Sequence, residues 1–170
     1  MSSPFRLVTR DELVMLLNVD TWRTRGSRER IPRRDVAMVA LVALCGVRPN
    51  ELQRLRLSDW RKDGRDIVSI PAPPARRSLY ASREIPLLRT AGLVLGPYLA
   101  LHPRKHDPNA PLFVAADGAP LTVASPSYDK HRTVGRKTGL GTSLLVILRA
   151  SYEEWVRSAQ TTDGSEAILL

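Results

Sequence analysis

The chain has 170 residues, of which 43% are hydrophobic and 25% are charged, and these values exclude a globally disordered protein. Its 26 Lys and Arg outnumber 17 Asp and Glu, giving a formal net charge of +9. Such a charge favours a polyanionic partner, nucleic acid above all, over an arginine-rich surface without a ligand. The single cysteine, Cys45, excludes an internal disulfide framework and a cysteine-based metal site.

The sequence shows no membrane segment. Its longest apolar run, from Val36 to Val47, is too short to cross a bilayer. The opening residues MSSPFRLVTRDEL lack the apolar core of a signal peptide. We therefore expect an intracellular, cytoplasmic protein with no membrane partner.

Helices are predicted for most of the first sixty residues. Thr9 and Glu12 form a capping box before a helix over TRDELVMLL. Six arginines lie between Trp22 and Asp35, a stretch expected to be largely a basic loop, and a second helix is expected to start at Pro32 and to end at Gly46. This helix is apolar on all sides, so it should lie buried at the centre. Pro49 should open a third helix.

Two strands, three further helices and the start of a fourth are predicted for the rest. Asp66–Ile70 and Arg83–Leu87 read as strands, joined by a long connection that contains Arg76 and Arg77. Helices are expected over TAGLVLGPYLAL, over the basic stretch SPSYDKHRTVGRKTG and over TSLLVILRASYEEWVRSAQ, with another beginning in TTDGSEAILL. His102 is expected in a surface loop, since Pro103 follows it. The prediction is one α+β domain over residues 1–170, mostly helical with a small antiparallel β-sheet.

Arg48 stands out because it follows the apolar helix and precedes a carboxylate, Glu51, by three residues. Arginine suits phosphate because its planar fork donates two parallel hydrogen bonds and keeps its charge. From the residues alone, Arg48 either holds a phosphate or packs its stem and pairs with Glu51. Composition and periodicity do not name a reaction.

Four stretches resemble the tyrosine recombinases, or phage integrases. ALCGVRPNELQRLRLSDW is similar to the first box of that family, a helix ending in Gly-x-Arg-x-x-Glu-Leu. SREIPL resembles the second strand of the family's hairpin, and APLFVAADGAPLT resembles the loop that follows. ILRASYEEWV lies where the second box, His-x-x-Arg-His, is expected. The resemblance covers nearly the whole chain and implies the fold of the family's catalytic domain.

The resemblance also implies a chemistry and a set of site residues. In this family a tyrosine cuts one DNA strand and forms a 3′-phosphotyrosine, without a metal or a cofactor. By resemblance Arg48 and Arg149 clamp the phosphate, and Glu51 orders the site. The family's hairpin lysine has no counterpart; Arg76 or Arg77 is the nearest cation, with Arg77 the candidate hairpin cation, and solvated loop charges are the favoured alternative for both. The candidate DNA-binding residues are Arg76, Arg77, Lys130, His131, Arg132, Arg136 and Lys137. Two alternatives stay open: Arg149 could pair with Glu153 one turn on, and the basic helix could be a solvated face.

The sequence departs from the family pattern at the groups that move protons and attack phosphorus. Val146 occupies the place of the second-box histidine, and Ala150 follows Arg149. Of the four tyrosines, Tyr80, Tyr98, Tyr128 and Tyr152, none lies in the nucleophile's place, which is expected beyond residue 170. The prediction is a domain truncated before the nucleophile box and unable to cut DNA by itself.

Three functions follow from the resemblance. The first is a protein that binds double-stranded DNA and is related to site-specific recombinases, which act in DNA recombination, DNA integration and prokaryotic mobile genetic elements. The second is an interaction module that docks on an intact recombinase or on itself. The third is a fragment of an active integrase. No metal and no cofactor are expected in any of them.

Overall fold

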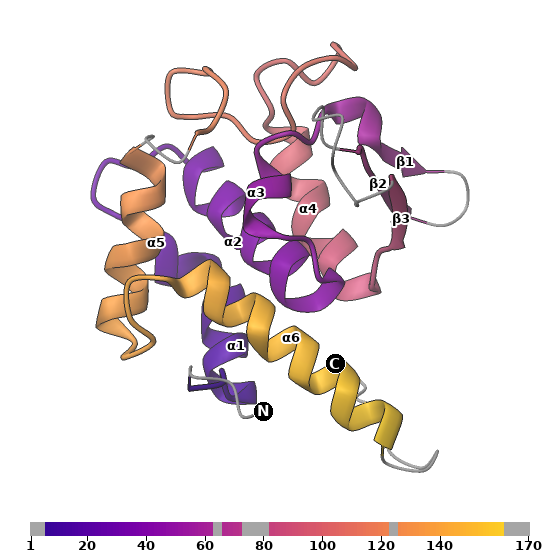
Figure 1. Cartoon of the computed structure of the whole chain (residues 1–170). Coiled ribbons are helices and arrows are strands. Elements are labelled where there is room, and N and C mark those ends of the chain that lie inside the picture. Colours follow the sequence, from indigo (N-terminus) through magenta and orange to yellow (C-terminus); the bar gives the residue numbers. More distant parts are fainter. Residues whose placement is uncertain (1–5, 63–65, 73–81, 123–125, 162–170) are drawn as a thin grey trace.

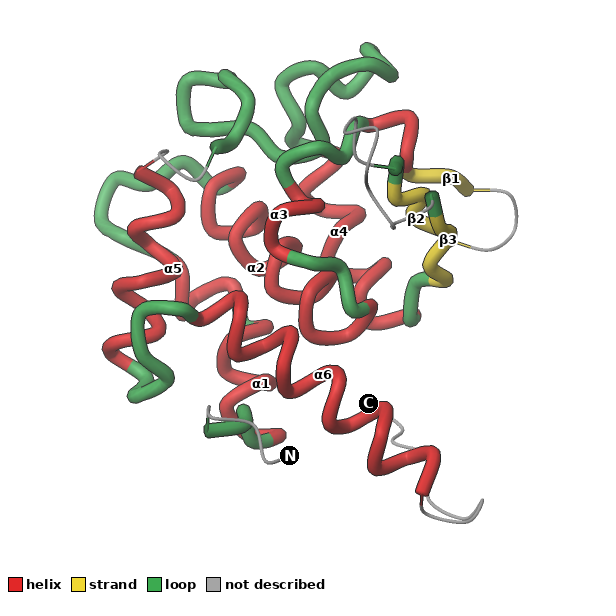
Figure 2. The backbone as a smooth tube through the Cα atoms, viewed as in Figure 1, coloured by secondary structure: helices red, strands yellow, loops and turns green. Residues whose placement is uncertain are grey.

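The computed structural model describes residues 6–62, 66–72, 82–122 and 126–161. The elements in chain order are α1 (Arg10–Leu17), η1 (Val19–Trp22), α2 (Arg30–Cys45), α3 (Pro49–Leu52), η2 (Leu57–Asp59), β1 (Trp60–Lys62), β2 (Asp66–Ile70), β3 (Arg83–Pro86), α4 (Arg89–Ala100), α5 (Pro126–Lys137) and α6 (Leu144–Thr161). The helices gather around α2, and the small sheet lies at one edge of the helical body (Figures 1 and 2).

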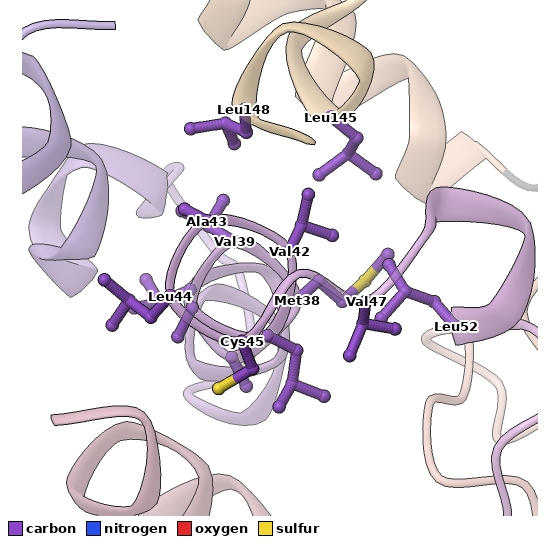
Figure 3. Close-up of a cluster of buried hydrophobic side chains, with 14 of the residues drawn as sticks. Met38, Val39, Val42, Ala43, Leu44, Cys45, Val47, Leu52, Leu145 and Leu148 are labelled. Carbon is purple, nitrogen blue, oxygen red and sulfur yellow. The ribbon is translucent and has the colours of Figure 1, made fainter. Parts of the chain in front are cut away.

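Helix α2 forms the centre of the core, as its uniformly apolar sequence predicted. Thirteen of its sixteen residues are buried, and it packs against α1, η1, α4 and α6. Figure 3 views its end, with Leu145 and Leu148 of α6 facing Val42 and its neighbours. The helix begins at Arg30, two residues before the predicted start at Pro32.

The predicted helix ends are confirmed where glycine, proline and capping residues supplied them. Gly46 ends α2 with φ of 67°, a left-handed conformation that glycine adopts without a side-chain clash. The capping box of α1 is complete: the Glu12 N–H donates to Thr9 Oγ1 at 3.3 Å, and the Thr9 N–H donates to Glu12 Oε2 at 2.9 Å. Pro49 opens α3.

The sheet is antiparallel, with strand order β1-β2-β3. Val68 of β2 pairs with Trp60 of β1 on one side and with Ile85 of β3 on the other, and its side chain is fully buried. Strands β2 and β3 match the predicted strands, except that β3 ends one residue earlier, at Pro86. Strand β1 was not predicted from the sequence. Arg76 and Arg77 lie outside the described residues.

One further expectation is wrong, and another is not tested by the structure. His102, expected in a surface loop, is 3% exposed, and its Nε2 lies 3.1 Å from the carbonyl oxygen of Pro111. The helix predicted to begin in the last ten residues lies outside the described part, apart from Thr161, which ends α6. Among the described residues, no helix has both the length and the apolar character needed to cross a membrane.

Candidate functional site

Arg48 and Glu51 meet at the first turn of α3. Arg48 is the N-cap residue with an extended backbone, and its N–H donates to Glu51 Oε2 at 2.8 Å. The Glu51 side chain is 5% exposed, whereas that of Arg48 is 35% exposed, so the guanidinium reaches solvent above a buried carboxylate. Arg48 Nη1 lies 3.7 Å from Glu51 Oε1, which is an ion-pair contact longer than a hydrogen bond.

A second arginine, Arg83 of β3, holds the same carboxylate. Its Nη1 donates to Glu51 Oε1 and its Nη2 donates to Glu51 Oε2, both at 2.8 Å. This is the bidentate arrangement in which a guanidinium and a carboxylate bind most strongly. Arg83 was predicted in a family-like strand but was not assigned to the site. No sequence signal joins Arg83 to Glu51, which lies 32 residues earlier in the chain.

Arg149 lies on α6, where its guanidinium has both a carboxylate partner and unsatisfied donors. Its Nη2 lies 3.1 Å from Glu153 Oε1, and its Cζ lies 5.1 Å from the centre of the Tyr152 ring. The pair with Glu153 that the sequence left open is therefore present. Arg149 Nε and Nη1 are shielded from solvent, and neither has a hydrogen-bond partner among the residues that the structure describes. Because an unmade hydrogen bond of a buried donor costs roughly 1–3 kcal/mol, a ligand oxygen at these donors would be stabilising.

The glycine that ends α2 brings α6 close to the loop that carries Arg48. A Cβ atom built on Gly46 would lie 2.3 Å from Tyr152 Cε1, so only glycine leaves room for this ring. Tyr152 in turn lies beneath Arg149, and α3 packs against α6. The arginines of the two boxes thus both belong to elements that meet at the C-terminal end of α2.

The basic helix α5 exposes part of its charge. Arg132, Arg136 and Lys137 are exposed on α5. Arg132 and Arg136 line an open pocket of about 480 Å³ together with Thr142 and Ser143, which directly precede α6. This pocket combines cationic and hydroxyl donors, a set that suits an anionic oxygen.

Lys130 and His131, by contrast, turn toward the core. His131 is 3% exposed, and its ring centroid lies 4.9 Å from that of Trp22. Burial lowers the pKa of His131 to about 3, so the imidazole is neutral at physiological pH. The prediction that His131 contacts DNA phosphates is wrong, because its side chain is buried. The Lys130 side chain is 17% exposed, and its Nζ lies 3.8 Å from Asp35 Oδ2.

Asp35 is the centre of a buried charge cluster that the sequence analysis missed. Arg34 and Asp35 are both fully buried at the start of α2. Arg34 Nε donates to Asp35 Oδ1 at 2.9 Å, and Arg34 Nη1 donates to the carbonyl oxygen of Val114 at 3.0 Å. Burial raises the pKa of Asp35 and, despite the nearby carboxylate, lowers that of Lys130. The cluster joins α2 to α5 and to the loop before it, so its evident role is structural.

The positions that depart from the recombinase pattern offer no proton-transfer group. Val146 is 47% exposed on α6, and its side chain is a hydrocarbon. Tyr98 is fully buried, its hydroxyl donates to the carbonyl oxygen of Leu112 at 2.9 Å, and burial raises its pKa to about 12. Tyr152 packs against Gly46. The side chains of Tyr80 and Tyr128 lie outside the described part of the structure.

Comparisons with known proteins give matches to solved structures alone: no family model and no curated protein matches the chain. The chain is similar to XerA recombinase, with 22% identity and a TM-score of 0.66, over 96% of this chain and 53% of that one. It is also similar to XerH site-specific recombinase bound to palindromic difH substrate in a post-cleavage complex, with 19% identity and a TM-score of 0.66. This match covers 94% of this chain and 44% of that one.

The integrase of the Tn1549 transposon, in complex with circular intermediate DNA, matches at 14% identity and a TM-score of 0.60, over 96% of this chain and 55% of that one. At these identities the comparisons show a shared fold. They confirm the predicted recombinase-like α+β class. The chain spans about half the length of the solved structures that it matches.

Proposed function

We propose that this chain is a recombinase-type DNA-binding domain that holds a backbone phosphate between Arg48 and Arg149. The observation that carries the proposal is the pair of unsatisfied donors, Nε and Nη1 of Arg149, on an element packed beside the Arg48 loop. Phosphate oxygens are the acceptors that a guanidinium fork fits best. In the family that the sequence resembles, the arginines at these two positions hold a phosphate.

The charge of the molecule supports the same ligand. The net charge of +9 would attract DNA at long range, and the exposed Arg132, Arg136 and Lys137 add cations on α5. Contacts to phosphates position a protein on the duplex without reading its sequence. We therefore expect binding to double-stranded DNA with a steep salt dependence and low sequence preference.

We further propose that this chain does not cut DNA by itself. General acid–base catalysis needs a titratable group within hydrogen-bond reach of the reacting oxygen. Val146 and Ala150, on either side of Arg149, cannot supply one. Incubation with supercoiled plasmid should therefore give neither nicked circles nor a covalent protein–DNA adduct. An adduct retained on the protein after denaturation would support the fragment of an active integrase instead.

Fluorescence anisotropy of a labelled duplex at two salt concentrations tests the phosphate site. The variant Arg48→Ala/Arg149→Ala should bind about tenfold or more weakly than the unmodified chain, since each charge-assisted hydrogen bond contributes about 1.5–3 kcal/mol. The matched control is Arg89→Ala/Arg104→Ala, which removes the same charge from two exposed arginines outside the site. Its affinity for DNA should fall by no more than about twofold to threefold, because only the long-range electrostatic attraction between the protein and DNA is reduced.

Equal losses in the two variants would mean that charge alone, and not the site, binds DNA. If the unmodified chain does not bind DNA at low salt, the proposal fails. The interaction-module alternative then predicts that an intact recombinase, or a second copy of this chain, is retained by the immobilised chain in the absence of DNA.

A further inference from the structure

The buried carboxylate of Glu51 lies near two arginines, of which one is hydrogen-bonded to it and the other is more distant. Arg83 donates to both of its oxygens at 2.8 Å, while Arg48 Nη1 lies 3.7 Å from one of them. Arg83 comes from β3, 32 residues further along the chain. We propose that Arg83 is a positioning residue for the phosphate site, because by pairing with Glu51 it keeps this carboxylate from competing with phosphate for Arg48. This inference rests on the proposed phosphate site.

The negative charge of Glu51 is buried. A carboxylate that is 5% exposed has little solvation and depends on a nearby cation. Among the described residues, two cations, Arg48 and Arg83, lie within 4 Å of this carboxylate, and Arg83 donates to both oxygens. The three side chains then carry a net charge of +1, the sum of two arginines and one glutamate. That remaining positive charge is what an approaching phosphate would meet at Arg48.

Removal of Arg83 would change the partner of Glu51. Arg48, already 3.7 Å away, would become the nearest cation that the structure places beside the carboxylate. A carboxylate and a phosphate would then compete for the same guanidinium fork, and the net charge of the cluster would be zero. The phosphate would lose both a hydrogen-bonding partner and the electrostatic attraction.

Arg83 also acts on the backbone at Arg48. Glu51 Oε2 accepts hydrogen bonds from Arg83 Nη2 and from the Arg48 N–H, both at 2.8 Å. The position of Glu51 therefore sets where α3 starts and where the Arg48 side chain leaves the backbone. Through this one carboxylate, β3, which lies at the edge of the molecule in Figure 1, is coupled to the start of α3.

The test is a double-mutant cycle of DNA affinity at low salt, with Arg83→Gln, Glu51→Gln and the double variant. Arg83→Gln should bind about tenfold more weakly, as expected when one partner of a buried charge pair is removed. The double variant should return to within about threefold of the unmodified chain, because the competing charge is gone. The control Arg89→Gln removes the same charge at an exposed position and should change affinity by less than about twofold.

Other results would overturn either the positioning role of Arg83 or the phosphate site. A double variant as weak as Arg83→Gln, or an Arg83→Gln affinity equal to that of Arg89→Gln, would overturn the positioning role. Arg48→Ala is measured alongside: if it binds DNA as well as the unmodified chain, the phosphate site itself fails. If Arg48→Ala weakens binding while Arg83→Gln does not, the positioning role alone fails.

Circular dichroism and urea unfolding establish that each variant is folded. If Arg83→Gln does not fold, Arg83→Lys takes its place, because lysine keeps the charge but cannot donate to both oxygens as a fork. Its affinity should fall by about threefold and recover when Glu51→Gln is added. An affinity for Arg83→Lys equal to that of the unmodified chain would then contradict the proposal.

Discussion

At the scale of single residues, Gly46 carries two separate constraints. Its φ of 67° disfavours any residue with a Cβ atom, and that atom would also meet the Tyr152 ring at 2.3 Å. Gly46→Ala should therefore lower the free energy of unfolding by about 2–4 kcal/mol, combining the backbone cost with overpacking. Urea denaturation measures the loss.

The matched control for Gly46 is Gly26→Ala. Gly26 has a similar φ of 77°, but nothing lies within 4 Å of the position of its Cβ atom. Its substitution should cost about 1–2 kcal/mol, the backbone part alone. Equal losses at the two glycines would show that Tyr152 moves aside without cost, and the packing of α6 on Gly46 would then not be rigid.

The residues also show what a sequence can and cannot reveal. The role of Gly46 as the end of α2 was predicted because a glycine directly after an apolar helix commonly adopts the left-handed conformation that stops the helix. The bidentate pair of Arg83 with Glu51 was not, because 32 residues separate the partners and only the docking of β3 beside α3 joins them. His131 was assigned to a DNA-binding face because its neighbours are basic, yet its ring packs on Trp22. Composition does not report which way a side chain points.

At the scale of elements, the contact between α2 and α5 should make stability depend on pH. His131 of α5 is surrounded by Trp22, Arg34, Asp35 and Lys130, and its pKa in the folded protein is about 3. In the unfolded chain its pKa is about 6.5, so below this pH the unfolded state binds the extra proton. His131 should therefore lower the free energy of unfolding as pH falls from about 6.5 toward 3, by up to about 1.4 kcal/mol per pH unit.

Urea denaturation at pH 7, 6 and 5 tests this dependence. His131→Gln should be less stable at pH 7 but should lose less stability between pH 6 and pH 5 than the unmodified chain. Asp35 acts with the opposite sign, since its raised pKa contributes stability that is lost as pH rises, and it is present in both proteins. Parallel pH profiles for the two proteins would contradict the burial of a neutral His131.

The elements themselves were predicted well where they are long or capped. Helices α1 to α6 and strands β2 and β3 follow from periodicity, proline and glycine positions and a capping box. Strand β1 was missed because three residues, Trp60–Lys62, are too few to show an alternating pattern, and it exists through its pairing with β2. The buried charge cluster was missed because Arg34 and Asp35 lie in a stretch whose composition is that of a basic loop.

At the scale of the whole molecule, the exposed cations of α5 should add to DNA binding through the release of counterions. Neutralising Arg132, Arg136 and Lys137 together with glutamine should reduce the slope of log K against log salt by about 0.9 for each phosphate contact that is lost. Anisotropy titrations over a range of salt concentrations measure the slope.

A variant that loses the same charge elsewhere distinguishes direct phosphate contacts by α5 from the general electrostatic attraction of the molecule for DNA. Arg89, Arg104 and Lys105 are also exposed, and their neutralisation should leave the salt slope nearly unchanged while lowering affinity slightly. If both triple variants reduce the slope equally, α5 is not a DNA-contacting face. The alternative from the sequence, a solvated basic face, would then hold.

The burial of α2 on every side has a consequence for how this protein can diverge. Only three of its sixteen residues escape burial, and all lie in the first four positions: Arg30, Ile31 and Arg33. From Arg34 onward, a substitution that leaves stability unchanged must preserve the side-chain volume, because the side chains contact neighbours on several helices at once. Natural variation should therefore accumulate at the start of this helix and around the rim of the molecule, while its second half changes only together with compensating substitutions in α4 or α6.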